Sequence, residues 1–491
     1  MPSSRPPADA GERPAPVQRD RKRAEEIAGR IERDIELGGY ERGDSLGTEP
    51  ELLARYQVAR ETLRAAIRQL ERNGIVEMRR GGRGGGGGML VAEPTANVAV
   101  RTIAAHLELT DVTWPEILEA RLLVEMQAIG TATERADAAG LARLRALAIE
   151  LEATSADIRE LARRELAIPT AIALLAGNTA AAIFSASLNL YSLDLMPAHF
   201  GTPEGLRTQA ALIGTQLRAV VDAICACDRA GAERAFEIFA SVSRRTAVAL
   251  ERRRREVAGN APSDPRAGTA DRKLGERVAL AIASDIAQRH LPEGERLGSE
   301  PSLLERHRVS RAVLREAIRG LELHGLVRTR RGVGGGIVVA RADPAYTIAT
   351  AASFLHRAQV QPVHYAQVRK ALAVGAAELT IARADAAAIQ ALVQAVRRFA
   401  DVPPAHFKNE MQAMQELICA ASGNRALTLL MQVVHAAGTS ERLVLAEEQM
   451  AALRRNLADT VAAIADGDAG RAKRLQLQHN RLIARRAGPQ S

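Results

Sequence analysis

Four arginines recur at four-residue intervals in one short stretch of this chain: Arg60, Arg64, Arg68 and Arg72. Side chains four residues apart share one face of an α-helix. Leu63, Ile67 and Leu70 recur on a different face, at the spacing of a buried stripe. The stretch therefore predicts a helix that presents guanidinium groups, which can pair bidentately with guanine edges or bind phosphates. A charged face that contacts only water is the alternative.

A second predicted helix precedes the arginine-bearing one. Thr48 stands before "EPELLARY", and Glu51 three residues later completes a capping-box pattern for a helix start. "QVA" then turns the chain, and "RETLRAAIRQLERNG" predicts a helix that ends at Gly74. A short helix, a tight turn and a basic second helix form a helix-turn-helix arrangement, whose second helix can enter the DNA major groove.

A glycine-rich stretch follows these helices. "GGRGGGGGMLVA", residues 81–92, has seven glycines in its first eight positions and lies after "IVEMRR", a predicted strand. The run lacks the Gly-Lys-Ser/Thr ending with which phosphate-binding loops hold nucleotides and Mg²⁺. We therefore interpret the two apolar segments as a strand hairpin with a glycine-rich tip, which is the wing of a winged helix-turn-helix domain.

The whole pattern occurs twice. Residues 47–82 align without a gap to residues 298–333, and 20 of the 36 positions are identical at a constant offset of 251. Three of the four spaced arginines return as Arg311, Arg315 and Arg319, whereas Leu323 replaces the fourth. The second glycine run is three residues shorter than the first. Because both copies keep the spaced arginines and the Arg-Arg-Gly sequence, DNA contact is favoured over a merely solvated surface.

The composition bounds the class of protein. A chain of 491 residues is too long for one hydrophobic core. Its formal net charge of +9 indicates a polyanionic partner. Three cysteines cannot form a disulfide framework and no stretch reaches 18 apolar residues, so we expect a cytoplasmic protein without a membrane span. No histidine groups with serine or cysteine in a catalytic pattern, so we expect no enzyme activity and no cofactor.

The regions after each helix-turn-helix have helical character, because residues 100–255 and 345–487 carry stripes of Ala, Leu and Ile. The predicted fold class is mainly α, with two winged helix-turn-helix domains, each followed by an all-helical bundle, in tandem duplication. A polar stretch rich in Gly, Pro and Asp predicts a linker at 256–273. We place the other parts at 1–22 (unstructured tail), 23–93 and 274–342 (DNA-binding domains), and 94–255 and 343–488 (bundles).

The repeated region is similar to a known DNA-binding domain. "SEPSLLERHRVSRAVLREAIRGLELHGLVRTRRGVGGGIVV" resembles the winged helix of GntR-family transcriptional regulators. Copy one departs at Ala59, where the family usually has Ser or Thr, and Pro50 and Pro301 stand where many members carry an arginine that contacts DNA. The resemblance implies DNA contacts by Arg60, Thr62, Arg64, Arg80, Gly81, Ser310, Arg311, Arg315, Arg331 and Gly332.

The helical regions resemble the FCD effector domain of FadR-type GntR proteins, through a Glu-x-Arg opening at Glu119 and Arg121 and through Gly-Asn pairs. Many FCD domains hold a divalent metal with one Asp and three His. The corresponding positions here are Glu165, Pro169, Leu217 and Phe239 in copy one, and Met411, Gln415, Leu457 and His479 in copy two. One imidazole does not make a metal site, so we expect no metal in either bundle.

The resemblance also implies an effector site in each bundle. Arg121 and Arg369 lie where FCD domains often present an arginine to a carboxylate effector. An arginine in an otherwise apolar bundle would suit an organic acid, and an ion pair at a surface or interface is the alternative. Asn178 and Asn424, from the two Gly-Asn pairs, complete the predicted effector-binding set.

These features predict a DNA-binding transcriptional regulator, a repressor, that responds to a small-molecule effector. We expect the bundles to pack as an internal pseudo-dimer, with a homodimer of chains as the alternative, and the two winged helices to read adjacent half-sites of double-stranded operator DNA. Two other interpretations remain open. One is a sensor or scaffold in which one DNA-binding copy has decayed, with copy one the candidate because Glu61 adjoins Arg60. The other is nonspecific architectural DNA binding.

Overall fold

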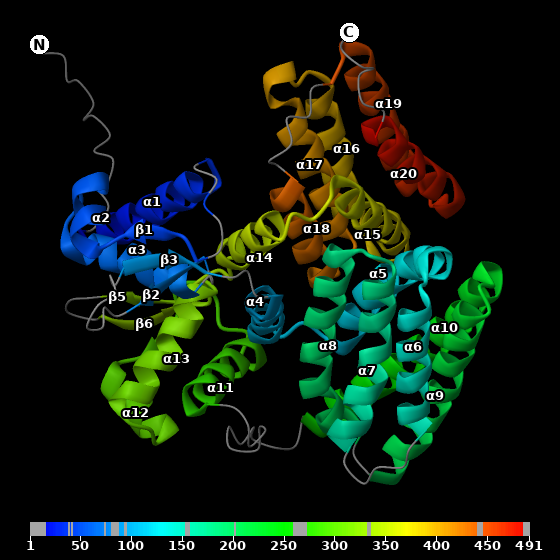
Figure 1. The fold of residues 1–491 in the computed structure, drawn as a ribbon, viewed down its shortest axis with the longest axis horizontal. Coiled ribbons are helices and arrows are strands. Elements are labelled where there is room, and N and C mark those ends of the chain that lie inside the picture. Colours follow the sequence, from blue (N-terminus) through cyan, green and yellow to red (C-terminus); the bar gives the residue numbers. More distant parts are fainter. Residues whose placement is uncertain are drawn as a thin grey trace, which may run out of the picture. The chain divides into compact units, whose positions relative to one another are not determined.

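The structure is a computed structural model that describes residues 16–37, 40, 43–72, 75–79, 88–92, 96–152, 158–200, 203–258, 273–330, 335–438 and 445–484. The chain forms two compact units, with the boundary between residues 98 and 99. Figure 1 shows that helices dominate, and the strands of the described residues form two small sheets, which confirms the predicted mainly α class. None of the helices in the described part of the chain is both long and apolar enough to span a membrane.

The first unit is a winged helix-turn-helix domain. Its elements are α1 (Pro16–Leu37), β1 (Ser45–Gly47), α2 (Glu49–Tyr56), α3 (Arg60–Arg72), β2 (Val76–Arg79) and β3 (Gly88–Val91). The antiparallel sheet has the order β1-β3-β2. Ile31, Leu52 and Leu63 are fully buried in its core, and the leucine stripe of α3 therefore faces inward as predicted. α1 begins at Pro16, inside the segment 1–22 that was expected to lack structure.

The second unit contains the first helical bundle. After α4 (Ala96–Leu109) the chain forms α5 (Trp114–Arg135), α6 (Ala138–Glu152), α7 (Ile158–Leu175), α8 (Thr179–Phe200), α9 (Pro203–Cys225) and α10 (Arg229–Ala258). Thr113 and Glu116 form the capping box that starts α5, since the Thr113 N–H donates to Glu116 Oε2 at 2.9 Å. Residues 259–272, most of the predicted linker, lie outside the described residues.

The same unit holds the second winged helix. Its elements are α11 (Leu274–Gln288), β4 (Arg296–Gly298), α12 (Glu300–His307), α13 (Arg311–Leu323), β5 (Val327–Arg330) and β6 (Gly336–Val339), with the sheet order β4-β6-β5. Its core also includes Leu109, the last residue of α4. The helix that follows the first winged helix therefore packs against the second one.

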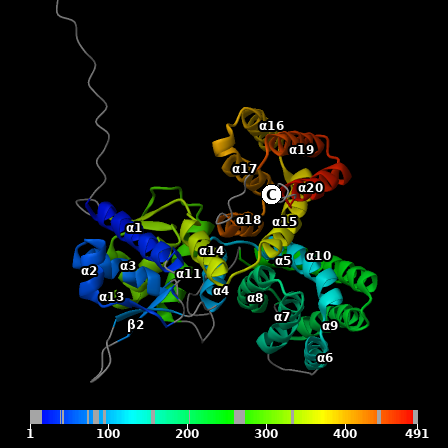
Figure 2. The same ribbon diagram turned by 45° about the horizontal axis from the view of Figure 1, so that its top comes forward.

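The second bundle completes the chain. It comprises α14 (Ala345–Arg357), α15 (Pro362–Arg383), α16 (Ala386–Ala400), α17 (Pro404–Ala421), α18 (Arg425–Ala437), α19 (Glu447–Ala465) and α20 (Ala469–Ala484). One continuous cluster of buried side chains runs through both bundles. α5 and α15 lie side by side where the bundles meet, in Figure 1 and in the turned view of Figure 2.

Glycine permits this close approach of α5 and α15. A Cβ atom added to Gly375 of α15 would lie 2.2 Å from Cδ1 of Leu123 of α5. Any larger residue at 375 would therefore push the Leu123 side chain aside, and the short distance between the helices depends on a missing side chain.

Candidate functional site

The first residue of α2 holds two of the predicted DNA-binding arginines. Glu49 Oε1 lies 2.8 Å from Nε of Arg64 and 3.2 Å from Nε of Arg60. The hydrogen bond from Arg64 lowers the pKa of the Glu49 carboxyl. Both arginine side chains remain exposed, at 53% and 63%. Exposed ion pairs contribute little free energy, so these guanidinium groups can exchange the carboxylate for DNA phosphates or guanine edges.

The second copy repeats this arrangement. Glu300 Oε1 lies 3.3 Å from Nε of Arg311 and 3.2 Å from Nε of Arg315. Sequence reasoning identified the arginines but missed the glutamate that orients them in each copy. The available signal was the Glu-Pro dipeptide that opens both first helices at equivalent positions.

The two recognition helices start differently. Ser310 Oγ accepts a hydrogen bond from the Val313 N–H at 3.4 Å and so caps α13. Ala59, at the equivalent position before α3, has no side-chain oxygen for this bond. Of the other predicted contact residues at these helix starts, Thr62 is half-buried and Ser310 is exposed.

A glutamate links each recognition helix to its wing. Glu71 Oε1 accepts the Met78 N–H at 3.2 Å, and Glu322 Oε1 accepts the Thr329 N–H at 2.9 Å. The strand pairs end at Arg79–Gly88 and at Arg330–Gly336, so the first wing has the longer tip. The predicted contact residues Arg80, Gly81, Arg331 and Gly332 lie in the tips, outside the described residues.

The interior of the first bundle contains an arginine between two carboxyl groups. Arg121 Nε lies 3.2 Å from Oε1 of Glu125, and both side chains are at most 3% exposed. Burial, with a smaller contribution from the neighbouring Glu165, raises the pKa of Glu125 to about 7 against the attraction of Arg121. Burial likewise raises the pKa of Glu165. The predicted effector-binding Arg121 is therefore already engaged inside the protein.

The interior of the second bundle has different chemistry. Arg369 Nε donates to Oδ1 of Asn480 at 3.3 Å, and His479 Nδ1 lies 3.2 Å from Oδ1 of Asn456. Burial lowers the pKa of His479 to about 3, with a smaller contribution from Arg369, so its ring is neutral near pH 7. Gln415 and Gln476 pair their amides at 3.3 Å. His435, whose Nδ1 lies 2.8 Å from Oε1 of Glu416, also interacts electrostatically with His479 and Arg369. This group therefore consists of amides, two imidazoles and one guanidinium, with a carboxylate beside them.

The residues at the family's metal positions do not fit a divalent ion. In the first bundle Leu217 and Phe239 are fully buried and Pro169 lies inside α7, which leaves Glu165 as a single oxygen ligand. In the second bundle Met411 and Leu457 leave only Gln415 and His479. Within the described ranges, no three His, Cys, Asp or Glu side chains gather where they could hold a metal.

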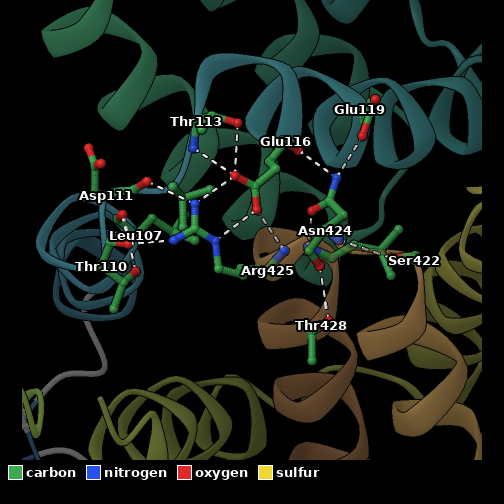
Figure 3. Close-up of polar contacts among 12 residues, drawn as sticks. Leu107, Thr110, Asp111, Thr113, Glu116, Glu119, Ser422, Asn424, Arg425 and Thr428 are labelled. Carbon is green, nitrogen blue, oxygen red and sulfur yellow. Dashed lines mark hydrogen bonds and ion pairs between the residues drawn. The ribbon is translucent and has the colours of Figure 1, made fainter. Parts of the chain in front are cut away.

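Asn178 and Asn424 connect the bundles in a pseudo-symmetric pair of contacts. The Asn178 amide donates to the His364 carbonyl at 3.3 Å and to Oε1 of Gln367 at 2.9 Å. The Asn424 amide donates to the Glu116 carbonyl at 2.9 Å and to Oε2 of Glu119 at 3.0 Å (Figure 3). His364 and Gln367 follow Glu116 and Glu119 by the same 248 positions. The contacts are thus related as in a twofold dimer.

These asparagines also start helices, since Oδ1 of Asn178 accepts the Ala181 N–H and Oδ1 of Asn424 accepts the Leu427 N–H. Each side chain therefore uses its oxygen for a cap and its amide nitrogen for the partner bundle. Effector binding by Asn178 and Asn424 stays a prediction, and the structure gives both side chains an interface role.

Arg425 adds a stronger link on one side of this interface. Its guanidinium donates to Glu116 Oε1 at 2.9 Å and Oε2 at 2.7 Å, and to the carbonyls of Thr110 and Asp111 at 2.7 and 2.8 Å (Figure 3). Burial alone would raise the pKa of Glu116, but the hydrogen bonds from Arg425 outweigh it and lower the pKa. The turn after α4 is thereby attached to the start of α18.

Comparison with known families agrees with the duplicated layout. Residues 23–84 and 274–337 match the family described as "Bacterial regulatory proteins, gntR family". Residues 116–239 and 365–482 match the family described as "FCD domain". No curated protein matches the chain.

Several solved structures are similar to parts of the chain. Streptococcus agalactiae GntR is 20% identical over 43% of this chain and 100% of its own, with a TM-score of 0.34. E. coli McbR/YncC is 14% identical over 47% of this chain and 98% of its own, with a TM-score of 0.24. A GntR family member from Pseudomonas syringae pv. tomato is 18% identical over 47% and 88%, with a TM-score of 0.21.

Proposed function

Because this chain belongs to the GntR family of transcriptional regulators, with two winged helices and two FCD domains in tandem, we propose that one chain supplies both halves of an operator-binding dimer. The pseudo-symmetric contacts of Asn178 and Asn424 are the observation that carries this proposal. They join two bundles of a single chain in the way that an isologous interface joins two subunits. A second chain is then unnecessary for two half-sites.

Both winged helices are proposed to read DNA. In each copy one glutamate holds two exposed arginines at the start of the recognition helix, which argues against decay of copy one. Thr62, Ser310 and the tip residues Arg80, Gly81, Arg331 and Gly332 are proposed as further contacts. Since Ala59 and Glu61 differ from Ser310 and Ala312, the two half-sites need not be identical.

Light scattering on the complex with a minimal two-half-site operator tests the stoichiometry. We expect one chain per duplex, and two chains on one minimal duplex would contradict the single-chain proposal.

Operator affinity tests the recognition helices. Arg64→Gln and Arg315→Gln should each weaken binding by on the order of 1–3 kcal/mol if each arginine reads a base. The exposed Arg397→Gln, in α16, removes the same charge elsewhere and serves as the control. An effect of Arg315→Gln alone would favour a decayed first copy, and equal affinity for any sequence would favour architectural binding.

The FCD domains are small-molecule sensing domains, and we propose an organic acid as the effector of the second bundle. Arg369, His479 and the surrounding amides could bind a carboxylate, while the nearby Glu416 pairs with His435. The same role for Arg121 requires the ligand to displace Glu125. Calorimetry with mono- and dicarboxylic acids tests this, and Arg369→Gln should abolish the binding heat while Arg121→Gln leaves it.

Repression is the proposed direction of control. A reporter gene placed behind the operator should be expressed more strongly when the chain is deleted. Lower expression after deletion would indicate activation instead.

A further inference from the structure

A cavity of about 610 Å³ lies at the junction of three parts of the second unit. One wall is the end of α4 with the turn that follows it, including His106 and Thr110. The second winged helix supplies another wall through α11 and the segment after β6, including Arg341. The third wall comes from the end of α17 and the start of α18, including Arg425. Of the four predicted effector-binding residues, Asn424 lines this cavity, whereas Arg121, Arg369 and Asn178 do not.

The lining combines apolar walls with positive charge. Leu107, Leu109, Ile286 and Leu429 contribute aliphatic surface. Two arginines line the cavity, and no aspartate or glutamate does. An apolar concavity with a few polar groups of one charge sign is typical of a site for a small organic ion of the opposite sign.

The two arginines differ in whether their guanidinium groups already have hydrogen-bond partners. Arg425 already satisfies its guanidinium through Glu116 and the carbonyls of Thr110 and Asp111 (Figure 3). Arg341 is exposed and has no ion pair or hydrogen bond with any residue that the structure describes. Arg341 is therefore the cation that is available to an incoming anion.

A buried polar atom without a partner adds a second observation. His106 is 7% exposed and lines the cavity, and its Nδ1 has no hydrogen-bond partner among the residues that the structure describes. Its ring packs 5.7 Å from the ring of His324 in the second winged helix. Burial lowers the pKa of His106 to about 4, although nearby Asp343 raises it slightly, so the ring is neutral near pH 7. A neutral imidazole can accept from or donate to a polar group of a ligand.

We propose that this cavity is a second small-molecule site, which binds an amphipathic organic anion. The anionic head pairs with Arg341, a polar group of the ligand reaches His106, and the apolar body lies against Leu107, Ile286 and Leu429. Because the walls belong to the second winged helix and to both helical regions, the occupant contacts all of them at once. Its binding therefore depends on how the second winged helix is held and, by thermodynamic reciprocity, biases that arrangement.

Two fluorescent probes test the site on the full chain. The anionic probe is 8-anilinonaphthalene-1-sulfonate, and the uncharged probe is N-phenyl-1-naphthylamine. Arg341→Gln should raise the dissociation constant of the anionic probe about tenfold, as expected for loss of a charged hydrogen bond. The same variant should leave the dissociation constant of the uncharged probe within about twofold, because the apolar walls are intact.

A filled-cavity variant and a charge control complete the test. Ala287→Phe places a ring in the cavity from half-buried Ala287 and should remove the fluorescence enhancement of both probes. Arg397→Gln should change neither. Wild-type binding of the anionic probe to Arg341→Gln, or wild-type enhancement in a folded Ala287→Phe, would overturn the proposal by placing the probe elsewhere. If Ala287→Phe does not fold, the result for Arg341→Gln decides alone, since that side chain is at the surface.

Discussion

At the scale of single residues, the first bundle buries more carboxylate than it can neutralise. Glu125 and Glu165 are both fully buried beside one cation, Arg121, and burial raises the pKa of each carboxyl. Neither oxygen of Glu125 makes a hydrogen bond to any described residue. Such a group opposes folding whenever it must ionise inside the protein.

Glu125→Gln should therefore change the pH dependence of stability. The folded pKa of about 7 exceeds 4.5, the ordinary pKa of a glutamate, so the folded state binds more protons between these pH values and the wild type loses stability as pH rises through them. The glutamine of the variant does not ionise, so the variant does not lose stability in this way. Its advantage in unfolding free energy should grow from near zero at pH 4.5 to on the order of 2–3 kcal/mol at pH 7.5, measured by urea titration. A pH-independent difference would show that Glu125 does not titrate in this range.

At the scale of elements, the two recognition helices share one amphipathic pattern but differ in how they begin. Leu63 and Leu314 occupy equivalent buried positions, so both helices are held by the same stripe. Only α13 has a capping side chain, Ser310, at its start. The first N–H groups of α3 lack that acceptor, and the helix that carries Arg60 is expected to fray more readily at the end that would contact DNA.

Ala59→Ser should supply the missing cap. We expect it to stabilise the first winged helix by about 1 kcal/mol, measured as unfolding free energy. Ser310→Ala is the matched control and should destabilise the second winged helix by a similar amount. A gain in unfolding free energy for Ala59→Ser and a loss for Ser310→Ala would support the proposed difference in capping between α3 and α13. No change in either variant would contradict it.

At the scale of the whole molecule, the two copies of the helical bundle contact each other within one chain. Asn178 and Asn424 face equivalent carbonyls, but the acceptor beside Asn178 is the neutral Gln367 and the acceptor beside Asn424 is the carboxylate of Glu119. Glu119 also pairs with Arg383, and Glu116 with Arg425. The two halves of the interface therefore share geometry and differ in charge.

Substitution by aspartate should expose this difference. Asn178→Asp and Asn424→Asp keep the capping oxygen and remove the amide donor, at a cost on the order of 1–3 kcal/mol each. Asn424→Asp should cost more, because the new carboxylate would face Glu119. Urea unfolding measures both. Equal costs would mean that the charge of Glu119 is already fully compensated by Arg383.

Short-range sequence patterns were sufficient to predict much of this fold. The capping residues, the leucine stripes and the alternation of helix and wing depend on neighbours within a few residues, so the helix-turn-helix elements, the all-helical bundles and the candidate arginines could be predicted. Family resemblance then indicated DNA contact and small-molecule sensing, and the family comparisons support both.

The sequence by itself therefore determined the duplicated order of domains and the residue types offered to DNA. The tertiary structure decided which glutamate holds each pair of arginines, that Arg121 is enclosed between two carboxyl groups, and that Asn178 and Asn424 join the bundles. It also decided that α4 meets the second winged helix around a cavity. The physical reason is distance along the chain: Asn424 contacts residues 305 and 308 positions away, and no periodicity in the sequence encodes such a pairing.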